Sequence, residues 1–142
     1  MERKKFLKSI GAGAAFAVLF PCLGSCSKEE DGGTVVKEPT GVDFTIDLNS
    51  DEAAKLDTPG GFILKNLVVV AKNVAGNFVA ASQVCAHQGY DQVRFNADQD
   101  GFFCDVHGAK YNQTGTPTNQ VTSNILKIYS VEQTGDLLRI FE

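Results

Sequence analysis

The stretch CAHQGYDQVRFNADQDGFFCDVHGAK, residues 85–110, contains both histidines of the 142-residue chain and two of its four cysteines. Each histidine closely follows a cysteine, as C-x-H at Cys85 and His87 and as C-x-x-H at Cys104 and His107. Thiolate sulfur and imidazole nitrogen are ligands that zinc, copper and iron prefer. The spacing therefore predicts a metal centre held between two loops.

The arrangement of the four ligands favours a cluster of two metal ions. A structural zinc finger usually takes both sulfurs from one tight loop and both nitrogens from another. Here each loop supplies one sulfur and one nitrogen, which suits two irons, one bound by both sulfurs and the other by both imidazoles. Two alternatives stay open: a mononuclear Cys2His2 zinc site, and a Cys85–Cys104 disulfide that leaves the histidines unexplained.

Short strands separated by turn residues surround this stretch. Residues 42–48 alternate apolar and polar side chains, the period of a half-buried strand. Further strands are expected at residues 62–64, 67–71, 78–82, 93–95, 101–103, 125–131 and 137–141, with one or two helical turns at 50–56. Many short strands without a sustained helical period predict an all-β domain, a sandwich or a small barrel.

The ligand pattern resembles that of the Rieske-type [2Fe-2S] proteins. Sixteen residues separate C-x-H from C-x-x-H, Gly89 and Gly108 follow the histidines, and Tyr111 comes soon after the second. The resemblance extends over residues 41–142. It implies a Rieske-like antiparallel β-sandwich with a small cluster-binding subdomain formed by two loops, and a [2Fe-2S] cluster as the cofactor.

The same resemblance implies roles for individual residues. Cys85 and Cys104 would bind the inner iron, and His87 and His107 the outer iron near the protein surface. Tyr111 stands where a tyrosine of the family donates a hydrogen bond to a cysteine sulfur. Packing beneath the loop is the other role open to this ring.

The sequence departs from the high-potential members of the family. Tyr90 and Val106 stand where those proteins have two further cysteines that bridge the loops, and Ala109 stands where they have a serine. Asp105 adds a negative charge, and residues 120–122 read Gln-Val-Thr where many members have Gly-Pro-Ala. These departures predict a reduction potential in the lower half of the Rieske range of about −150 to +300 mV.

The N-terminus resembles a bacterial lipoprotein export signal over residues 1–25. A basic start precedes an apolar stretch at residues 10–23, which is too short to cross a bilayer comfortably, and LGSC at residues 23–26 resembles a lipobox. Cys26 would then be lipidated, and residues 26–40 would form a flexible tether. RKKFLK at residues 3–8 resembles a twin-arginine motif with Lys4 in place of the second arginine, so both export routes stay open.

Loss of the signal would remove four basic residues and one acidic residue, leaving nine basic and sixteen acidic residues and a net charge of −7. Such a charge argues against nucleic acid as a partner. We expect an exported, lipid-anchored one-electron carrier or subunit that serves a membrane or exported oxidoreductase. We do not expect a complete Rieske oxygenase, since the sequence has no further histidine for a mononuclear iron. The alternatives from other classes are a lipoprotein binding module with structural zinc and a metal-free β-sandwich lipoprotein. Among electron carriers, the runner-up is a cytoplasmic oxygenase-type ferredoxin, and the export signal counts against it.

Overall fold

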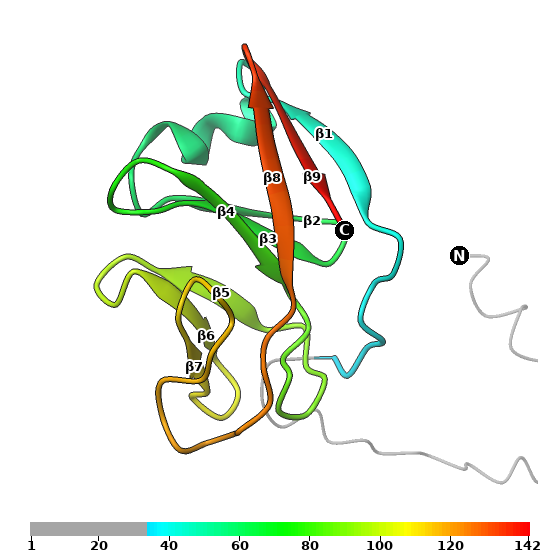
Figure 1. The fold of residues 1–142 in the computed structure, drawn as a ribbon, viewed down its shortest axis with the longest axis vertical. Coiled ribbons are helices and arrows are strands. Elements are labelled where there is room, and N and C mark those ends of the chain that lie inside the picture. The colour runs from blue at the N-terminus through cyan, green and yellow to red at the C-terminus, as the bar shows by residue number, and fades with distance from the viewer. Residues whose placement is uncertain (1–33) are drawn as a thin grey trace, which may run out of the picture.

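The computed structural model describes residues 34–142 (Figure 1). The predicted export signal, its twin-arginine-like motif and Cys26 lie outside the described residues. Within residues 34–142, no helix is long and apolar enough to cross a membrane.

The larger of two antiparallel sheets has six strands in the order β1-β9-β8-β4-β3-β2. A 3-10 helix, η2 (Asp51–Asp57), joins β1 to β2, where the sequence predicts one or two helical turns. The alternating pattern predicted at the start of the domain forms β1, which pairs with the C-terminal strand β9. The strands are β1 (Asp43–Asp47), β2 (Phe62–Lys65), β3 (Val68–Lys72), β4 (Phe78–Ser82), β8 (Ile128–Thr134) and β9 (Leu137–Phe141).

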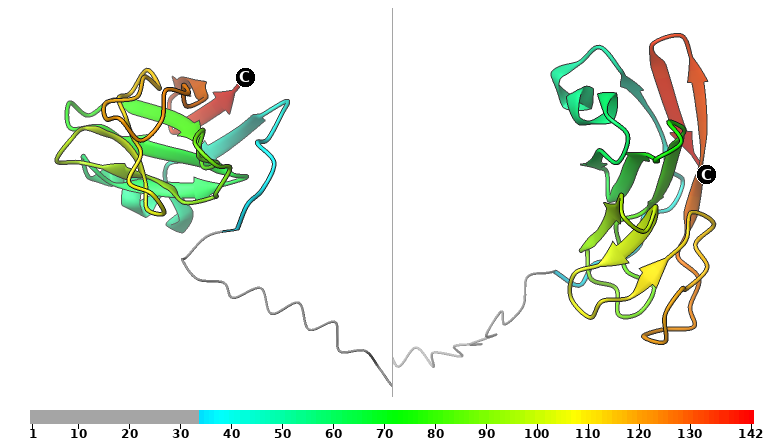
Figure 2. Two further views of the ribbon diagram at one scale, coloured as in Figure 1. Left: turned by 90° about the horizontal axis from the view of Figure 1, so that it is seen from below. Right: turned by 90° about the vertical axis from the view of Figure 1, so that its left-hand side faces the viewer.

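The smaller sheet has three strands, β5 (Val93–Asn96), β6 (Gly101–Cys104) and β7 (Lys110–Tyr111). The hairpin predicted from the sequence is the β5–β6 pair. The two-residue strand β7 is not predicted, because two residues are too few to show a period. Figure 1 shows this sheet below the larger one, and the right-hand view of Figure 2 separates the two layers.

Strands β3 and β4 form a wall between two apolar cores. Val68 and Val70 of β3 face the large core, together with Leu56 of η2, whereas Val69 and Ala71 face the other core. All four of these β3 residues are fully buried, because successive side chains of a strand point to opposite faces. The second core, called the site core below, contains Val69, Ala71, Ala81, Cys85, Val93, Phe95, Phe102, Cys104, Ala109, Tyr111 and Leu126.

Strand β8 begins three residues later than the sequence predicts. Leu126 is buried, and its N–H donates to the carbonyl of Gly115 at 2.9 Å rather than to a neighbouring strand. Residues 112–127 therefore form a long connection that returns along the small sheet before the chain joins the large one at Ile128 (Figure 1).

We predict that Gly115→Ala destabilises the domain far more than Gly76→Ala. Both glycines have positive φ, +83° and +91°, which costs an alanine about 1 kcal/mol at either position. A Cβ at Gly76 meets open space, whereas a Cβ at Gly115 would overlap the carbonyl oxygen of Leu126. Overpacking adds about 2 kcal/mol, for a total near 3 kcal/mol. Urea unfolding of both variants measures the difference, and equal losses would contradict the close contact.

Candidate metal centre

Two loops carry the four predicted ligands. The first ligand loop, residues 83–92, follows β4 and contains Cys85 and His87; the second, residues 105–109, joins β6 to β7 and contains His107. Cys104 is the last residue of β6. The prediction that these residues lie in loops at strand ends is therefore confirmed, except that Cys104 still belongs to its strand.

The two loops close with the same backbone hydrogen bonds. The N–H of Cys85 donates to the carbonyl of Tyr90 at 2.7 Å, and the N–H of Cys104 donates to that of Ala109 at 2.8 Å, five residues onward in each case. In return, a glycine four residues after each cysteine, Gly89 or Gly108, donates to the cysteine carbonyl, at 2.8 and 3.0 Å.

The two glycines have nearly the same conformation. Their φ values are +72° for Gly89 and +74° for Gly108, in the left-handed region where a side chain is strained. Each loop is therefore a tight turn with the same closing hydrogen bonds, although the histidine is the third residue of the first turn and the fourth residue of the second. This gives a structural reason for the C-x-x-x-G spacing that both sequence motifs share.

The two cysteine sulfurs lie together in the site core. Cys85 and Cys104 are free thiols and almost completely buried. The neighbouring Cys104 thiol is the largest cause that lowers the pKa of Cys85, to about 5, and the Tyr111 hydroxyl and nearby backbone N–H groups lower it further against the effect of burial. The Cys85 sulfur, followed by burial, raises the pKa of Cys104. Both cysteines therefore belong to the same apolar core, and their sulfurs are candidate ligands for one metal ion.

The hydroxyl of Tyr111 lies 3.5 Å from the Cys85 sulfur, as the sequence predicts for this tyrosine. Burial, and next the Cys85 sulfur, raise the pKa of Tyr111. The ring is also fully buried in the site core. The side chain of Tyr111 thus packs in the site core, with its hydroxyl within hydrogen-bond reach of the Cys85 sulfur.

The two histidine rings form the second pair of donors. Their centroids are 5.0 Å apart and their planes are perpendicular. His107 is exposed and His87 is half-buried. Within residues 34–142, Nδ1 of His87 is the one buried side-chain nitrogen or oxygen that lacks a hydrogen-bond partner. A buried polar atom without a partner is costly, and an imidazole nitrogen in that condition is an available metal ligand.

The donors are therefore arranged as two pairs, a sulfur pair and an imidazole pair. In the described part of the chain, no three His, Cys, Asp or Glu side chains converge closely enough to hold a single metal ion. A cluster of two irons requires only two protein ligands for each iron. The residues thus fit the [2Fe-2S] group that the sequence suggests.

Two asparagines that the sequence analysis does not identify fasten the ligand loops. The side chain of Asn119 donates to the carbonyl of Gly108 at 2.7 Å and accepts from the N–H of Lys110 at 3.2 Å. The side chain of Asn124 donates to the carbonyl of Ala86 at 2.8 Å. The partner of Asn124 lies 38 residues away along the chain, so no local sequence pattern indicates this contact.

The residues that depart from the Rieske pattern have definite places. Tyr90 contacts the ring of His107, with centroids 5.8 Å apart. Val106 packs against the site core, where Ala109 is fully buried. Asp105 is exposed, and in the third segment Val121 packs against the site core while Gln120 faces solvent.

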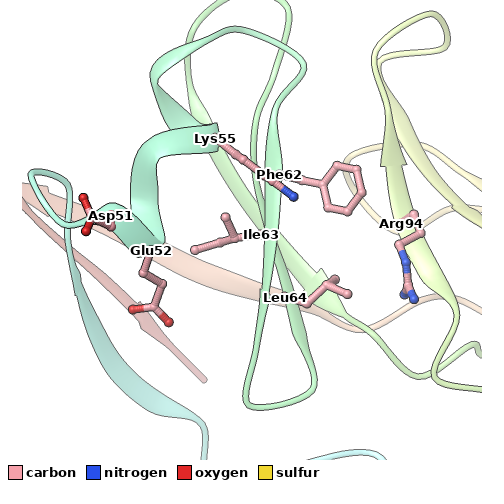
Figure 3. Close-up of a pocket in the computed structure, with 7 residues that line it drawn as sticks. All are labelled: Asp51, Glu52, Lys55, Phe62, Ile63, Leu64 and Arg94. Carbon is pink, nitrogen blue, oxygen red and sulfur yellow. The ribbon is translucent and has the colours of Figure 1, made fainter.

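An open groove of about 480 Å³ lies outside this centre, between η2, β2 and β5 (Figure 3). Two of its charged groups already have partners: the guanidinium of Arg94 donates to the carbonyls of Asp91 and Val93, and Glu52 pairs with Lys65 at 2.8 Å. Figure 3 shows the carboxylates of Asp51 and Glu52 on the side of the groove away from Arg94. We assign no site to this groove.

Comparison with solved structures places the fold among Rieske proteins. The ferredoxin of carbazole 1,9a-dioxygenase from Nocardioides aromaticivorans IC177 is 24% identical, with a TM-score of 0.52, and the match covers 61% of this chain and 91% of the ferredoxin. The plasma membrane Rieske protein PetC3 from Synechocystis PCC 6803 is 25% identical, with a TM-score of 0.51, over 63% of this chain and 93% of PetC3. The predicted Rieske-like fold is confirmed.

Comparison with curated proteins finds no match to this sequence. The model of the Rieske [2Fe-2S] domain matches residues 43–130, which is more than half of the chain and includes both ligand loops. The [2Fe-2S] cofactor predicted from the sequence is confirmed by this match. The sulfur pair, the imidazole pair and the fold thus agree, and the chain belongs to the Rieske [2Fe-2S] domain family.

Proposed function

We propose that Cys85, His87, Cys104 and His107 are the protein ligands of the cluster in this electron-transfer domain, with the sulfurs on one iron and the imidazoles on the other. The observation that supports this most is the orphaned Nδ1 of His87, which is buried and has no partner among the described residues. The perpendicular imidazole pair and the adjoining pair of buried sulfurs supply the remaining ligands.

The ligand set controls the charge of the site. When bound, a [2Fe-2S] cluster accepts and releases one electron at a time. Two thiolates and two neutral imidazoles bring an oxidised core of charge +2 to zero overall, whereas four thiolates bring it to −2. Adding an electron to a neutral site meets less repulsion in a buried environment, so the two histidines raise the reduction potential.

The two ends of the site have different surroundings. Both sulfurs are buried in the site core, which excludes water, whereas His107 is exposed. The imidazole end is therefore where a redox partner can approach, and we infer that electrons enter and leave there. The partner class we propose is a membrane or exported oxidoreductase. PetC3, with the same fold, is a plasma membrane protein by its description.

We also propose that the protein is exported and held at a membrane by a lipid on Cys26. The support is the sequence of residues 1–26, with its basic start, short apolar stretch and LGSC. One lipid-modified cysteine would keep an electron carrier close to membrane partners while the domain stays in the aqueous phase.

Ligand variants test the cluster assignment. The purified chain should be brown, contain iron and acid-labile sulfide, and give a rhombic EPR signal with an average g below the free-electron value after reduction with dithionite. Alanine at position 85, 87, 104 or 107 should abolish this signal. Asp105→Asn is the control, since this exposed carboxylate is not a proposed ligand. A colourless protein with one zinc per chain would contradict the assignment.

Replacing Tyr111 by Phe should lower the reduction potential. The hydroxyl lies 3.5 Å from the Cys85 sulfur. A sulfur bound to iron as a thiolate can only accept, so the hydroxyl would donate to it, and this bond strengthens as the cluster gains negative charge. A difference of about 1 kcal/mol between the redox states corresponds to about 40 mV for one electron. Tyr129→Phe is the matched control, since Tyr129 is also buried but belongs to the large core. Redox titration monitored by EPR compares the variants, and equal shifts would refute the specific role.

The lipid anchor has a separate test. In a bacterial host, the wild-type chain should fractionate with membranes and incorporate radiolabelled fatty acid, whereas Cys26→Ser should do neither, because the acceptor thiol is gone. Cys22→Ser is the control, since the residues before Cys22 do not form a lipobox. Unchanged fractionation of Cys26→Ser would remove the anchor from the proposal without affecting the cluster.

A further inference from the structure

The segment Thr34–Val36 runs antiparallel to the first ligand loop, although the sequence analysis assigns it to a flexible tether. The N–H of Val36 donates to the carbonyl of Gly89 at 2.9 Å, and the N–H of Asp91 donates to the carbonyl of Thr34 at 3.0 Å. Val35 and Tyr90 form the β-bridge between these two bonds. We call residues 34–36 the strap.

Asp91 connects the strap to the rest of the domain. Its carboxylate accepts a hydrogen bond from the N–H of Thr34 at 2.9 Å. Its carbonyl accepts from the side chains of Gln83 at 2.9 Å and Arg94 at 3.1 Å, which fix the end of the loop to its own base and to β5. The strap therefore binds a part of the loop that is already anchored.

Tyr90 lies between the strap and both ligand loops. Its backbone carbonyl accepts the hydrogen bond from Cys85 that closes the first loop. Its ring contacts the imidazole of His107, which belongs to the second loop, at a centroid distance of 5.8 Å and an angle of 64°. One residue thus joins the strap, the first loop and a ligand of the second loop.

The imidazole of His107 needs such a contact. It is exposed, and its ring makes no hydrogen bond with the described residues, so contacts with the rings of His87 and Tyr90 are what orient it. An edge-to-face contact of this kind contributes about 0.5–1.5 kcal/mol. That is enough to favour one orientation of an exposed ring over the others.

We propose that the strap is part of the cluster site and that Tyr90 is a positioning residue for His107. The strap holds the backbone of Gly89–Asp91, which fixes where the Tyr90 ring lies, and the ring holds the imidazole in the orientation that binds iron. This inference rests on the proposed ligand assignment. It also makes the segment that follows the predicted lipid attachment part of the structure of the redox centre.

Two pairs of substitutions in the full chain test the proposal. Val36→Pro removes the N–H that donates to Gly89, and Lys37→Pro is its control, because the N–H of Lys37 makes no hydrogen bond with the described residues. Tyr90→Ala removes the ring that contacts His107, and Tyr90→Phe keeps it. The second pair separates the ring contact from the hydroxyl.

Three measurements compare these variants. Transfer of iron to an excess of chelator should be about tenfold faster in Val36→Pro and Tyr90→Ala than in the wild type, and unchanged in the two controls. The g values of the reduced cluster should differ from the wild type in Tyr90→Ala and equal those of the wild type in Tyr90→Phe. A purely structural role of Tyr90 would not produce this difference. Hydrogen exchange at the Asp91 amide should be faster than in the wild type in Val36→Pro and unchanged in Lys37→Pro.

The outcomes separate this inference from the proposed function. Wild-type rates of iron loss in both Val36→Pro and Tyr90→Ala would overturn the inference while leaving the cluster assignment intact. A wild-type chain without a cluster would overturn the assignment, and exchange at Asp91 in the metal-free protein would still report whether the strap is formed. If Tyr90→Ala does not fold, the proline pair decides alone, since an unchanged Asp91 exchange rate in Val36→Pro refutes the strap.

Discussion

Burial of both faces of β3 and β4 is the constraint on which the rest of the structure depends. Successive side chains of these strands pack into two separate cores, so the large sheet and the cluster-binding sheet share one wall. The first ligand loop leaves this wall directly after β4, and the second leaves β6, which packs against the same site core. The relative position of the loops is therefore set by packing, before any ligand is considered.

The two ligand loops that leave this wall close with the same backbone hydrogen bonds. A cysteine starts a turn, a glycine with positive φ four residues later closes it, and a histidine projects from between them. The sulfurs then point inward and the imidazoles lie toward the surface, so buried and exposed ends of the centre follow from the turn geometry. This division suits an electron carrier, which must protect its cofactor and still approach a partner.

Local patterns were sufficient to predict the all-β class, most strands and the Cys-His pairs, because alternation and scarce residue types leave a signal within a few residues. The contacts that complete the site leave no such local signal in the sequence. These contacts use the side-chain amides of Asn119 and Asn124, a residue type that is common in loops, and the backbone groups of the strap. The partners of Asn124 and of the strap also lie far away along the chain. The strap itself is Thr-Val-Val, but the residues on either side of it are charged or are glycine and proline, and this composition favours a flexible tether when neighbours in space are unknown.

The matched turns have a consequence for how the cofactor is lost. Under the proposed ligation, each turn supplies one sulfur to the inner iron and one imidazole nitrogen to the outer iron. Local opening of a single turn would therefore remove one ligand from both irons at once. Stepwise release, with one iron gone and the other secure, has no structural support. Disassembly should accordingly be all-or-none, and the lifetime of the loaded protein is governed by whichever turn opens more readily.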